Sequence, residues 1–361
     1  MTTIPRKIRV LIVDDSVTIR RLLTEALASD PEFEVPGTAA NGKIAIAKIG
    51  QTPPDIVTLD VEMPEMDGLA TLAEIRKSHP KLPVVMFSSL TERAAHTTLE
   101  ALARGATDYF AKPSGSSGLV GSMKAVREGL LPRLKSLVFP GKGAAAHKPP
   151  PQLATARIRV DMLAIGASTG GPNAVADMLA RLPKLPIPAV ITQHMPVLFT
   201  RMFAERLAAS TPHRVREAKH GDALEPGLML IAPGDYHMTL YRDGQITRVK
   251  LDQGPPENSC RPAVDPMFRS VAEVYGAHTL AVVLTGMGQD GLRGCEAVRA
   301  VGGQILAQDE ASSVVWGMPG FVVRANLADS VGPPDTLAML IKNRINFGRT
   351  TAKNEAFHGS R

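Results

Sequence analysis

The sequence predicts an α/β protein in which two doubly wound, mostly parallel sheets form two domains. Three observations indicate this fold. The chain has 361 residues, which is long for a single domain. Short β-branched runs alternate with longer amphipathic stretches, as in parallel sheets built from strand–helix pairs. The stretch PGKGAAAHKPPP (140–151) interrupts this alternation, and its three successive prolines are typical of an extended spacer.

The first domain is expected to hold five strand–helix pairs. The expected strands are IRVLIV (8–13), FEVPGTA (33–39), DIVTL (55–59), PVVMF (83–87) and TDYFA (107–111). The expected helices start at Val17, at Gly42, after Met66, at Arg93 and, last, near Met123, the last one running to Leu137. This order favours an open parallel sheet with helices on both faces.

The alternation resumes after the spacer. The expected strands there are DMLAIGA (161–167), PAVITQ (188–193), LMLIA (228–232), HTLAVVLTG (278–286) and GGQILAQ (302–308). Within YHMTLYRDGQITRVKL (236–251), Asp243-Gly244 separates two alternating runs and indicates an antiparallel hairpin. We therefore expect one domain at 1–132, a linker at 133–157, a larger domain at 158–345 and a flexible tail at 346–361.

Charge and composition narrow the classes of function. Lys and Arg outnumber Asp and Glu by 41 to 35, but the excess of six lies between Arg133 and Val160, so the rest of the chain gives no reason to expect a nucleic-acid partner. No apolar run reaches the ~18 residues of a membrane span, and the N-terminus does not resemble a signal peptide. We expect a cytoplasmic protein without membrane insertion. Cys260 and Cys295 match no metal-binding pattern and are expected to be buried free thiols.

Carboxylates follow two strands of the first domain. Asp14 and Asp15 end the first strand and Asp60 ends the third, so they should meet at one edge of the sheet. Clustered carboxylates repel one another without a cation, and hard oxygen ligands suit Mg²⁺. Lys112 ends the fifth strand and Ser88 the fourth, so this edge has the groups needed to hold a phosphoryl group on Asp60. Each strand-end aspartate taken alone is about as often a helix cap.

The motifs VLIVDDS, DIVTLDVEMPEMDG, PVVMFSS and GATDYFAKP resemble the receiver domain of bacterial response regulators over about residues 7 to 130. The resemblance implies a flavodoxin-like fold in which Asp60 is phosphorylated. The Mg²⁺ ligands that it implies are Asp14, Asp15, Asp60 and the backbone carbonyl of Glu62. The switch residues that it implies are Ser88, Tyr109 and Lys112.

A glycine-rich segment, GASTGG (166–171), follows a strand and opens a helix in the second domain. A phosphate-binding P-loop needs Gly-Lys-Ser/Thr, and no lysine lies near. A dinucleotide fingerprint needs G-x-G-x-x-G, but Ser168 stands in place of the second glycine. The segment matches G-x-S-x-G, which places a nucleophilic serine on a sharp strand-to-helix turn. A loop whose glycines only let the helix pack is an equal alternative.

Two further residues are expected at the same edge of the second sheet. His194 follows PAVITQ, and Asp290 follows HTLAVVLTG. With Ser168 they would form a triad in which His194 accepts the serine proton and Asp290 stabilises the imidazolium. Glycines around Met287 would let backbone N–H groups reach an oxyanion. Taken singly, His194 is more often a loop or core histidine, and Asp290 an N-cap of the helix that follows.

The motifs GASTGGP, ITQHMP and LTGMGQDG resemble the catalytic domain of the bacterial chemotaxis protein-glutamate methylesterase family over about residues 158 to 345. The order of receiver, linker and esterase is also that of the family. The resemblance implies Ser168, His194 and Asp290 as the triad and the backbone N–H of Met287 as the oxyanion donor. The chain order Ser, His, Asp makes the α/β-hydrolase superfamily the weaker alternative.

The two resemblances together imply a serine hydrolase activated by phosphorylation. It would convert glutamate methyl esters on chemoreceptors to glutamate and methanol, and would deamidate receptor glutamines at the same site. The implied phosphodonor is a chemotaxis histidine kinase, and the implied substrate is a methyl-accepting chemoreceptor. Mg²⁺ would serve the receiver, while the esterase reaction would need no cofactor. A monomer is expected.

Two alternatives stay open at this point. One is a second domain that binds DNA, as in transcriptional response regulators, although its α/β pattern contains no compact helix-turn-helix. The other is a second domain that is an inactive scaffold and binds receptors. Retention of Ser168, His194 and Asp290 together argues against the scaffold.

Overall fold

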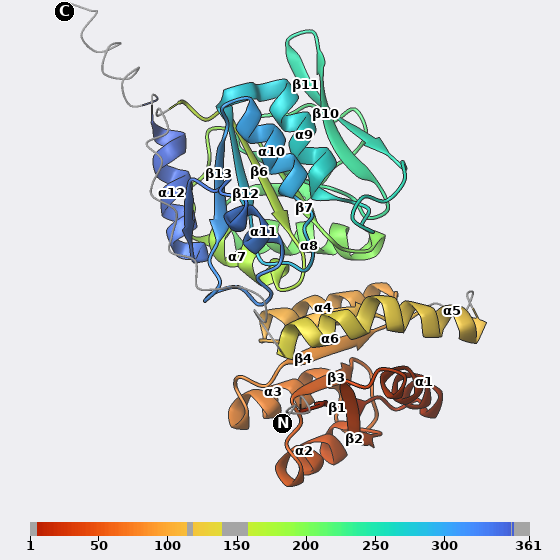
Figure 1. Cartoon of the computed structure of the whole chain (residues 1–361). Coiled ribbons are helices and arrows are strands. Elements are labelled where there is room, and N and C mark those ends of the chain that lie inside the picture. Colours follow the sequence, from red (N-terminus) through yellow and green to blue (C-terminus); the bar gives the residue numbers. More distant parts are fainter. Residues whose placement is uncertain (1–5, 114–117, 139–157, 348, 350–361) are drawn as a thin grey trace, which may run out of the picture. The chain divides into compact units, whose positions relative to one another are not determined.

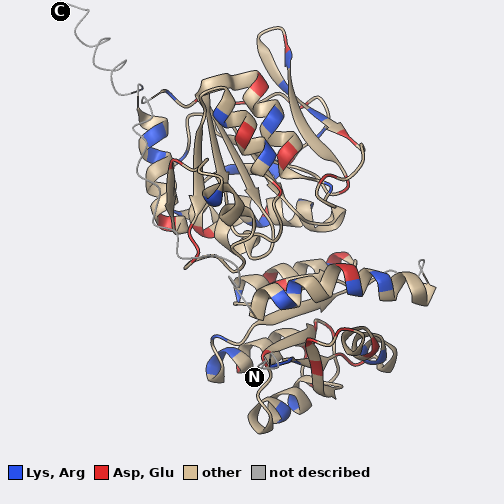
Figure 2. Cartoon of the chain, in the orientation of Figure 1, with Lys and Arg blue, Asp and Glu red and all other residues tan. Residues whose placement is uncertain are grey.

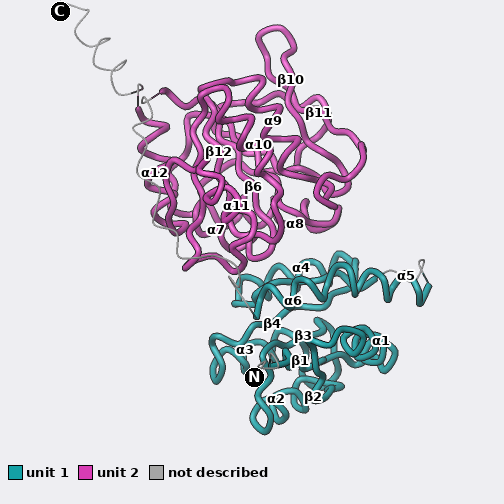
Figure 3. Tube along the Cα trace, viewed as in Figure 1, with its two compact units in different colours: residues 1–140 teal, residues 141–361 magenta. Residues whose placement is uncertain are grey.

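The computed structural model describes residues 6–113, 118–138, 158–347 and 349. The chain divides into two compact units, unit 1 (Met1–Pro140) and unit 2 (Gly141–Arg361) (Figure 3). Each unit has its own parallel sheet. Throughout the described residues, no helix combines the length and the apolar character that a membrane span requires.

Unit 1 is a five-stranded parallel sheet in the order β2-β1-β3-β4-β5 (Figure 1). The strands are β1 (Ile8–Val13), β2 (Phe33–Ala39), β3 (Ile56–Asp60), β4 (Val84–Ser88) and β5 (Asp108–Ala111). The helices between them are α1 (Val17–Ala28), α2 (Gly42–Gln51), α3 (Gly68–Ser78) and α4 (Glu92–Ala103). The strand order reverses at β1, the position at which doubly wound sheets bind ligands. The predicted fold class is confirmed for this unit.

Polar side chains fix the starts of these helices. The N-caps whose side chains accept a hydrogen bond from a backbone N–H of the first turn are Ser16, Asn41, Asp67 and Thr91. Such caps satisfy N–H groups that have no partner inside the helix. Because Ser16 caps α1, the neighbouring Asp14 and Asp15 are not needed for that purpose, which weakens their interpretation as helix caps.

The last helical segment of unit 1 is longer than predicted. It consists of α5 (Gly118–Ala125), the π-helical turn η2 (Val126–Leu130) and α6 (Leu131–Val138). Pro132 follows the wider turn, and a proline cannot donate the usual hydrogen bond one turn back. Leu134 and Leu137 are buried, so residues 133–138, which were expected to lie in the linker, are helical and belong to the packing of unit 1.

Unit 2 contains a seven-stranded parallel sheet in the order β14-β13-β12-β6-β7-β9-β8. Its strands are β6 (Met162–Ala167), β7 (Ala189–Gln193), β8 (Arg214–Glu217), β9 (Leu228–Ile231), β12 (Thr279–Val283), β13 (Gln304–Gln308) and β14 (Ser330–Gly332). Its helices are α7 (Gly171–Ala180), α8 (Val197–Ser210), α9 (Val264–Tyr275), the 3₁₀ turn η3 (Gly276–His278), α10 (Leu292–Ala300), α11 (Met318–Arg324) and α12 (Pro334–Asn346). The predicted hairpin is present as β10 (His237–Asp243) and β11 (Ile246–Asp252).

The central strands of this sheet carry no charged residues (Figure 2). Strands that are buried on both faces read as continuous apolar runs, which made them visible in the sequence. The two edge strands, β8 and β14, were not predicted. The sequence of β8 is RVRE and that of β14 is only SVG, so neither shows the pattern of a buried strand.

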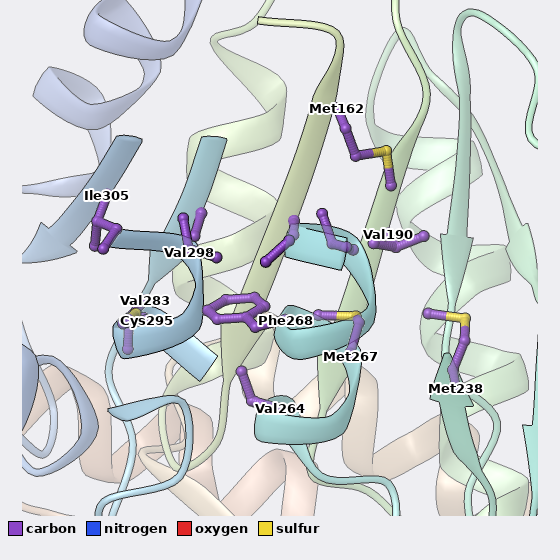
Figure 4. Close-up of a cluster of buried hydrophobic side chains, with 14 of the residues drawn as sticks. Met162, Val190, Met238, Val264, Met267, Phe268, Val283, Cys295, Val298 and Ile305 are labelled. Atoms are coloured by element: carbon purple, nitrogen blue, oxygen red, sulfur yellow. The ribbon is translucent and has the colours of Figure 1, made fainter. Parts of the chain in front are cut away.

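A hydrophobic cluster fills the space between this sheet and helices α9 and α10 (Figure 4). Phe268 of α9 lies at its centre and is fully buried beside Val264, Val283 and Val298. A Cβ atom at Gly294 would come within 2.5 Å of Phe268, so the glycine lets α10 approach α9 closely. This packing holds the N-terminal end of α9 next to the carboxyl ends of the strands.

Replacing Phe268 with alanine is expected to destabilise unit 2 by about 3–5 kcal/mol, because it removes a buried ring and leaves a cavity. Urea unfolding followed by tryptophan fluorescence measures this effect in unit 2, since Trp316 is the only tryptophan of the chain. Met339→Ala is the control, because Met339 is 55% exposed. Equal losses of stability in the two variants would contradict the description of this core.

Candidate functional site

Three aspartates converge at the carboxyl edge of the sheet of unit 1. The parallel register of β1 and β3 pairs Val13 with Leu59, so the next residues, Asp14 and Asp60, lie side by side. Each of Asp14, Asp15 and Asp60 offers an oxygen that lies within 4.8 Å of the others. Asp14 and Asp60 are buried, whereas Asp15 is exposed. The sequence prediction that these carboxylates meet is therefore confirmed, and the donor set of hard oxygens fits Mg²⁺.

Lys112 neutralises part of this cluster. Its Nζ lies 2.8 Å from Asp14 Oδ2 and 2.7 Å from Asp60 Oδ2. Burial raises the pKa of Asp60 to about 6, the charge of Asp14 adds to the rise, and Lys112 opposes it. Burial lowers the pKa of Lys112, but its contacts with the two carboxylates outweigh this effect and raise it. The cluster thus favours binding of a further cation, which would keep both carboxylates ionised.

Ser88 and Tyr109 lie near this edge but point into the packing of the unit. Ser88 is fully buried, accepts a hydrogen bond from Thr98 at 2.8 Å and donates to the carbonyl of Ala94 at 3.3 Å. Among the described residues, no hydrogen bond joins Ser88 to Asp60. Burial raises the pKa of Tyr109 far above its ordinary value. Glu62 donates its backbone N–H to Asp60, which lowers the pKa of that carboxyl.

Ser168 stands on the turn between β6 and α7 in unit 2. Its backbone N–H donates to the carbonyl of Thr285 at 3.0 Å, and its carbonyl accepts from Gly171 N–H at 2.8 Å. Gly170 has φ 76°, a left-handed conformation that glycine adopts without strain. The chain therefore turns sharply from strand to helix directly after Ser168. This turn is the geometry that G-x-S-x-G predicts.

His194 is the neighbour of Ser168 on the next strand. The register of β6 and β7 pairs Ala167 with Gln193, and the backbone N–H of His194 donates to the carbonyl of Ala167 at 3.1 Å. His194 Nε2 lies 2.7 Å from Asp290 Oδ2. The structure thus brings His194 and Asp290 together across 96 positions of sequence.

Asp290 is held by several donors besides His194. Its Oδ2 accepts from Val264 N–H at 2.6 Å, and its Oδ1 accepts from Asp265 N–H at 3.0 Å. Asn258 Nδ2 donates to the same Oδ1 at 3.0 Å. Burial raises the pKa of Asp290, but His194 and the two N–H groups outweigh burial and lower it. Asp290 therefore remains ionised, and it caps the start of α9 as well as orienting His194.

The predicted N-cap role of Asp290 for the following helix is only partly right. Asp290 Oδ1 accepts from Gly291 N–H at 3.0 Å, yet the N-cap residue of α10 is Gly291 itself, with φ 92°. The principal capping bonds of Asp290 go to α9 instead. A local sequence pattern could not show the bonds to α9, because β12 separates that helix from Asp290 in the chain.

Of the three proposed triad residues, only His194 and Asp290 are joined by a hydrogen bond. In the described part of the chain, no hydrogen bond joins Ser168 Oγ to His194. The second imidazole nitrogen, Nδ1, lies 3.4 Å from Cys260 Sγ instead. The expectation of two buried thiols is correct for Cys295 and wrong for Cys260, which is half-buried beside His194. The sequence contained no signal for this contact, because the two residues lie 66 positions apart.

One backbone N–H group near Ser168, that of Met287, is available to donate a hydrogen bond to an oxyanion. The N–H groups of Ser168 and Gly286 are already bonded to the carbonyls of Thr285 and Val315, each at 3.0 Å. Within the described residues, by contrast, the N–H of Met287 has no hydrogen-bond acceptor. A Cβ atom at Gly286 would come within 2.8 Å of Ser168 Cβ, so this loop runs directly against the serine.

Comparisons with known proteins match both units. The family model for CheB methylesterase matches residues 163–341, and that for the response regulator receiver domain matches residues 10–124. A protein-glutamate methylesterase/protein-glutamine glutaminase from Nocardioides sp. is 49% identical over 354 residues, covering 93% of this chain and 96% of the relative. A relative of the same name from Trichodesmium erythraeum is 47% identical over 351 residues, covering 94% and 99%. The crystal structure of the Thermotoga maritima CheB methylesterase catalytic domain is 38% identical, with a TM-score of 0.50, and covers 52% of this chain and 99% of that one.

Proposed function

Because the chain belongs to the CheB methylesterase family, with a response regulator receiver domain before the methylesterase domain, we propose that Ser168, His194 and Asp290 are its catalytic residues and Asp60 its phosphorylation site. The protein is a protein-glutamate methylesterase and protein-glutamine glutaminase of chemotaxis, controlled by phosphorylation of its receiver. Because the chain belongs to this family, we reject the two alternatives for the second domain, a DNA-binding output domain and an inactive scaffold.

In the proposed reaction, Ser168 Oγ attacks the carbonyl carbon of a receptor glutamate methyl ester. Asp290 accepts a hydrogen bond from Nε2–H of His194, so Nδ1 is the nitrogen that takes the serine proton. The same proton passes to the departing methoxide, which leaves as methanol, and the Met287 N–H stabilises the oxyanion. Water then attacks the acyl-enzyme, with His194 again as base, and releases glutamate. A receptor glutamine reacts by the same steps with ammonia as the leaving group.

In the receiver, the carboxylate of Asp60 attacks the phosphorus of the donor, and the donor group leaves. The Mg²⁺ ligands that we propose are Asp14, Asp15, Asp60 and the backbone carbonyl of Glu62. The ion, when bound, neutralises charge on the phosphoryl oxygens. Lys112 already lies 2.7 Å from Asp60 and would pair with a phosphoryl oxygen. We propose that Ser88 then turns from Thr98 to the phosphoryl group and that Tyr109 follows this movement.

A receiver requires a phosphodonor, and the methylesterase requires a chemoreceptor. We propose a chemotaxis histidine kinase as the donor and the cytoplasmic region of methyl-accepting chemoreceptors as the substrate. A cytoplasmic monomer that binds neither nucleic acid nor membrane, and an esterase reaction without a cofactor, remain predictions. We propose that, along the sequence, the receiver precedes the segment that follows α6 and the esterase comes after it.

The observation that best supports this proposal is the position of Ser168, His194 and Asp290 at one carboxyl edge of the sheet. The direct test is release of methanol from membranes that contain methylated chemoreceptors. Wild-type protein should release methanol in proportion to enzyme concentration, and mass spectrometry should find glutamate at the modified positions. Absence of methanol release from these membranes would overturn the proposal.

Replacing Asp15 with asparagine is expected to weaken Mg²⁺ binding about 10- to 100-fold, because it removes one of three carboxylates from the donor set. Asp15 makes no ion pair with Lys112, so the contacts of Lys112 with Asp14 and Asp60 should remain. Calorimetric titration of the full chain with Mg²⁺ measures the change. Glu34→Gln, on β2, is the control for loss of one negative charge. An unchanged affinity in Asp15→Asn would remove Asp15 from the proposed ligands.

A further inference from the structure

His194 has both of its nitrogens occupied before any substrate binds. Nε2 lies 2.7 Å from Asp290 Oδ2, and Nδ1 lies 3.4 Å from Cys260 Sγ. The side chain of His194 is only 8% exposed, so water reaches little of the ring. Cys260 is half-buried. The imidazole therefore sits between a carboxylate and a thiol, in the order sulfur, imidazole, carboxylate.

The contact with Asp290 decides which nitrogen is the base. Asp290 is ionised and accepts only, so Nε2 carries the hydrogen and Nδ1 carries the lone pair in neutral His194. Nδ1 is thus the nitrogen that must take a proton from Ser168. Cys260 engages it in either protonation state, as an S–H donor to neutral imidazole or as a thiolate beside imidazolium.

The charged groups around this pair are mainly negative. Asp290 contacts His194 directly, and Asp265 lies behind Asp290, where Asn258 Nδ2 bridges the two carboxylates at 2.9 and 3.0 Å. Glu257 and Arg269 neutralise each other at 2.5 Å. Burial lowers the pKa of His194, but Cys260 and Asp290 outweigh burial and raise it to about 10. The surroundings therefore favour the imidazolium form of His194.

We infer that Cys260 is a positioning residue that restrains the esterase by competing with Ser168 for Nδ1 of His194. This inference rests on the proposed roles of Ser168 and His194. While Cys260 holds Nδ1, the imidazole cannot accept the serine proton, and no hydrogen bond joins it to Ser168 within the described residues. Productive catalysis requires Nδ1 to leave the sulfur and turn to Ser168 Oγ.

Removing the thiol should therefore speed hydrolysis and change its pH dependence. In the wild type, His194 is held protonated, so kcat/KM for methanol release should still rise with pH above neutrality. In Cys260→Ala, the base form should appear at lower pH, which shifts the rising limb down by about one unit or more and raises the rate at pH 7 about tenfold. Cys260→Ser should stay closer to the wild type than Cys260→Ala does, since a hydroxyl can also form a hydrogen bond with Nδ1.

Cys295→Ala is the matched control, because it removes the other thiol, which lies in the core. Its pH profile should coincide with that of the wild type. The inference is wrong if the profiles of wild type and Cys260→Ala coincide, or if Cys260→Ala is slower at every pH. Ser168→Ala in the Cys260→Ala background tests the proposed function separately: hydrolysis that persists there would refute Ser168 as the nucleophile, whatever the effect of Cys260.

A second measurement does not depend on activity. Alkylation of Cys260 by iodoacetamide, followed by mass spectrometry, should have a different rate in Ser168→Ala protein, where the sulfur contacts His194 Nδ1, than in a protein without this imidazole. The protein without this imidazole is the double variant Ser168→Ala/His194→Ala, in which the contact with the sulfur is lost. Equal alkylation rates in the two proteins would overturn the pairing of Cys260 with His194.

Discussion

Ser168→Ala is expected to lower methyl-ester hydrolysis by about 10⁴-fold or more, because it removes the hydroxyl that we propose forms the acyl-enzyme. His194→Ala should cost a similar factor, and the double variant should be little slower than either single one, since the members of a triad act as a unit. Initial rates of methanol release from methylated receptor membranes measure all three variants.

The matched control for this prediction is Ser210→Ala, at the exposed end of α8. It should retain wild-type hydrolysis. Phosphorylation of the receiver should be unchanged in Ser168→Ala, because the serine and Asp60 belong to different units. Substantial turnover by Ser168→Ala would point to another nucleophile, and Cys260, beside His194, would then be the first to examine.

Asp60→Asn is expected to abolish phosphorylation while leaving basal hydrolysis intact. The amide has no carboxylate oxygen to attack phosphorus, whereas the esterase residues lie in the other unit. Incorporation of labelled phosphate from a small phosphodonor, with and without Mg²⁺, measures this effect. Wild-type protein should be labelled only when Mg²⁺ is present.

Asp55→Asn provides the control for Asp60→Asn. Asp55 precedes the first residue of β3, at the opposite end of the same strand, and pairs with Arg6 instead of the acidic cluster. It should be labelled like the wild type. Label that persists on Asp60→Asn would place the acceptor elsewhere, with Asp14 and Asp15 as the remaining carboxylates of the cluster.

Most of the fold could be predicted because the central strands are buried on both faces and read as uninterrupted apolar runs. The positions of Asp60 and His194 followed from the same feature, since a residue that ends a parallel strand lies at the carboxyl edge of the sheet. The edge strand β8 carries charges on three of its four residues and gives no such pattern.

Contacts between side chains of distant loops could not be predicted. The hydrogen bond between His194 and Cys260 depends on the path of the loop before α9. This path is set by the contacts of Asp290 with Asn258 and with the N-terminal N–H groups of that helix. The orientation of Ser88 toward Thr98 likewise depends on the packing of β4 against α4. Neither arrangement leaves a periodicity or a motif in the sequence.

The central claim is that phosphorylation of Asp60 controls hydrolysis at Ser168. The most direct test is the ratio of methanol-release rates with and without a small phosphodonor, in the presence of Mg²⁺, on the same receptor membranes. The wild type should give a ratio of about ten or more, which corresponds to only about 1.4 kcal/mol of transition-state free energy, and Asp60→Asn should give a ratio of one. A ratio of one for the wild type, or an equal increase in Asp60→Asn, would contradict the account.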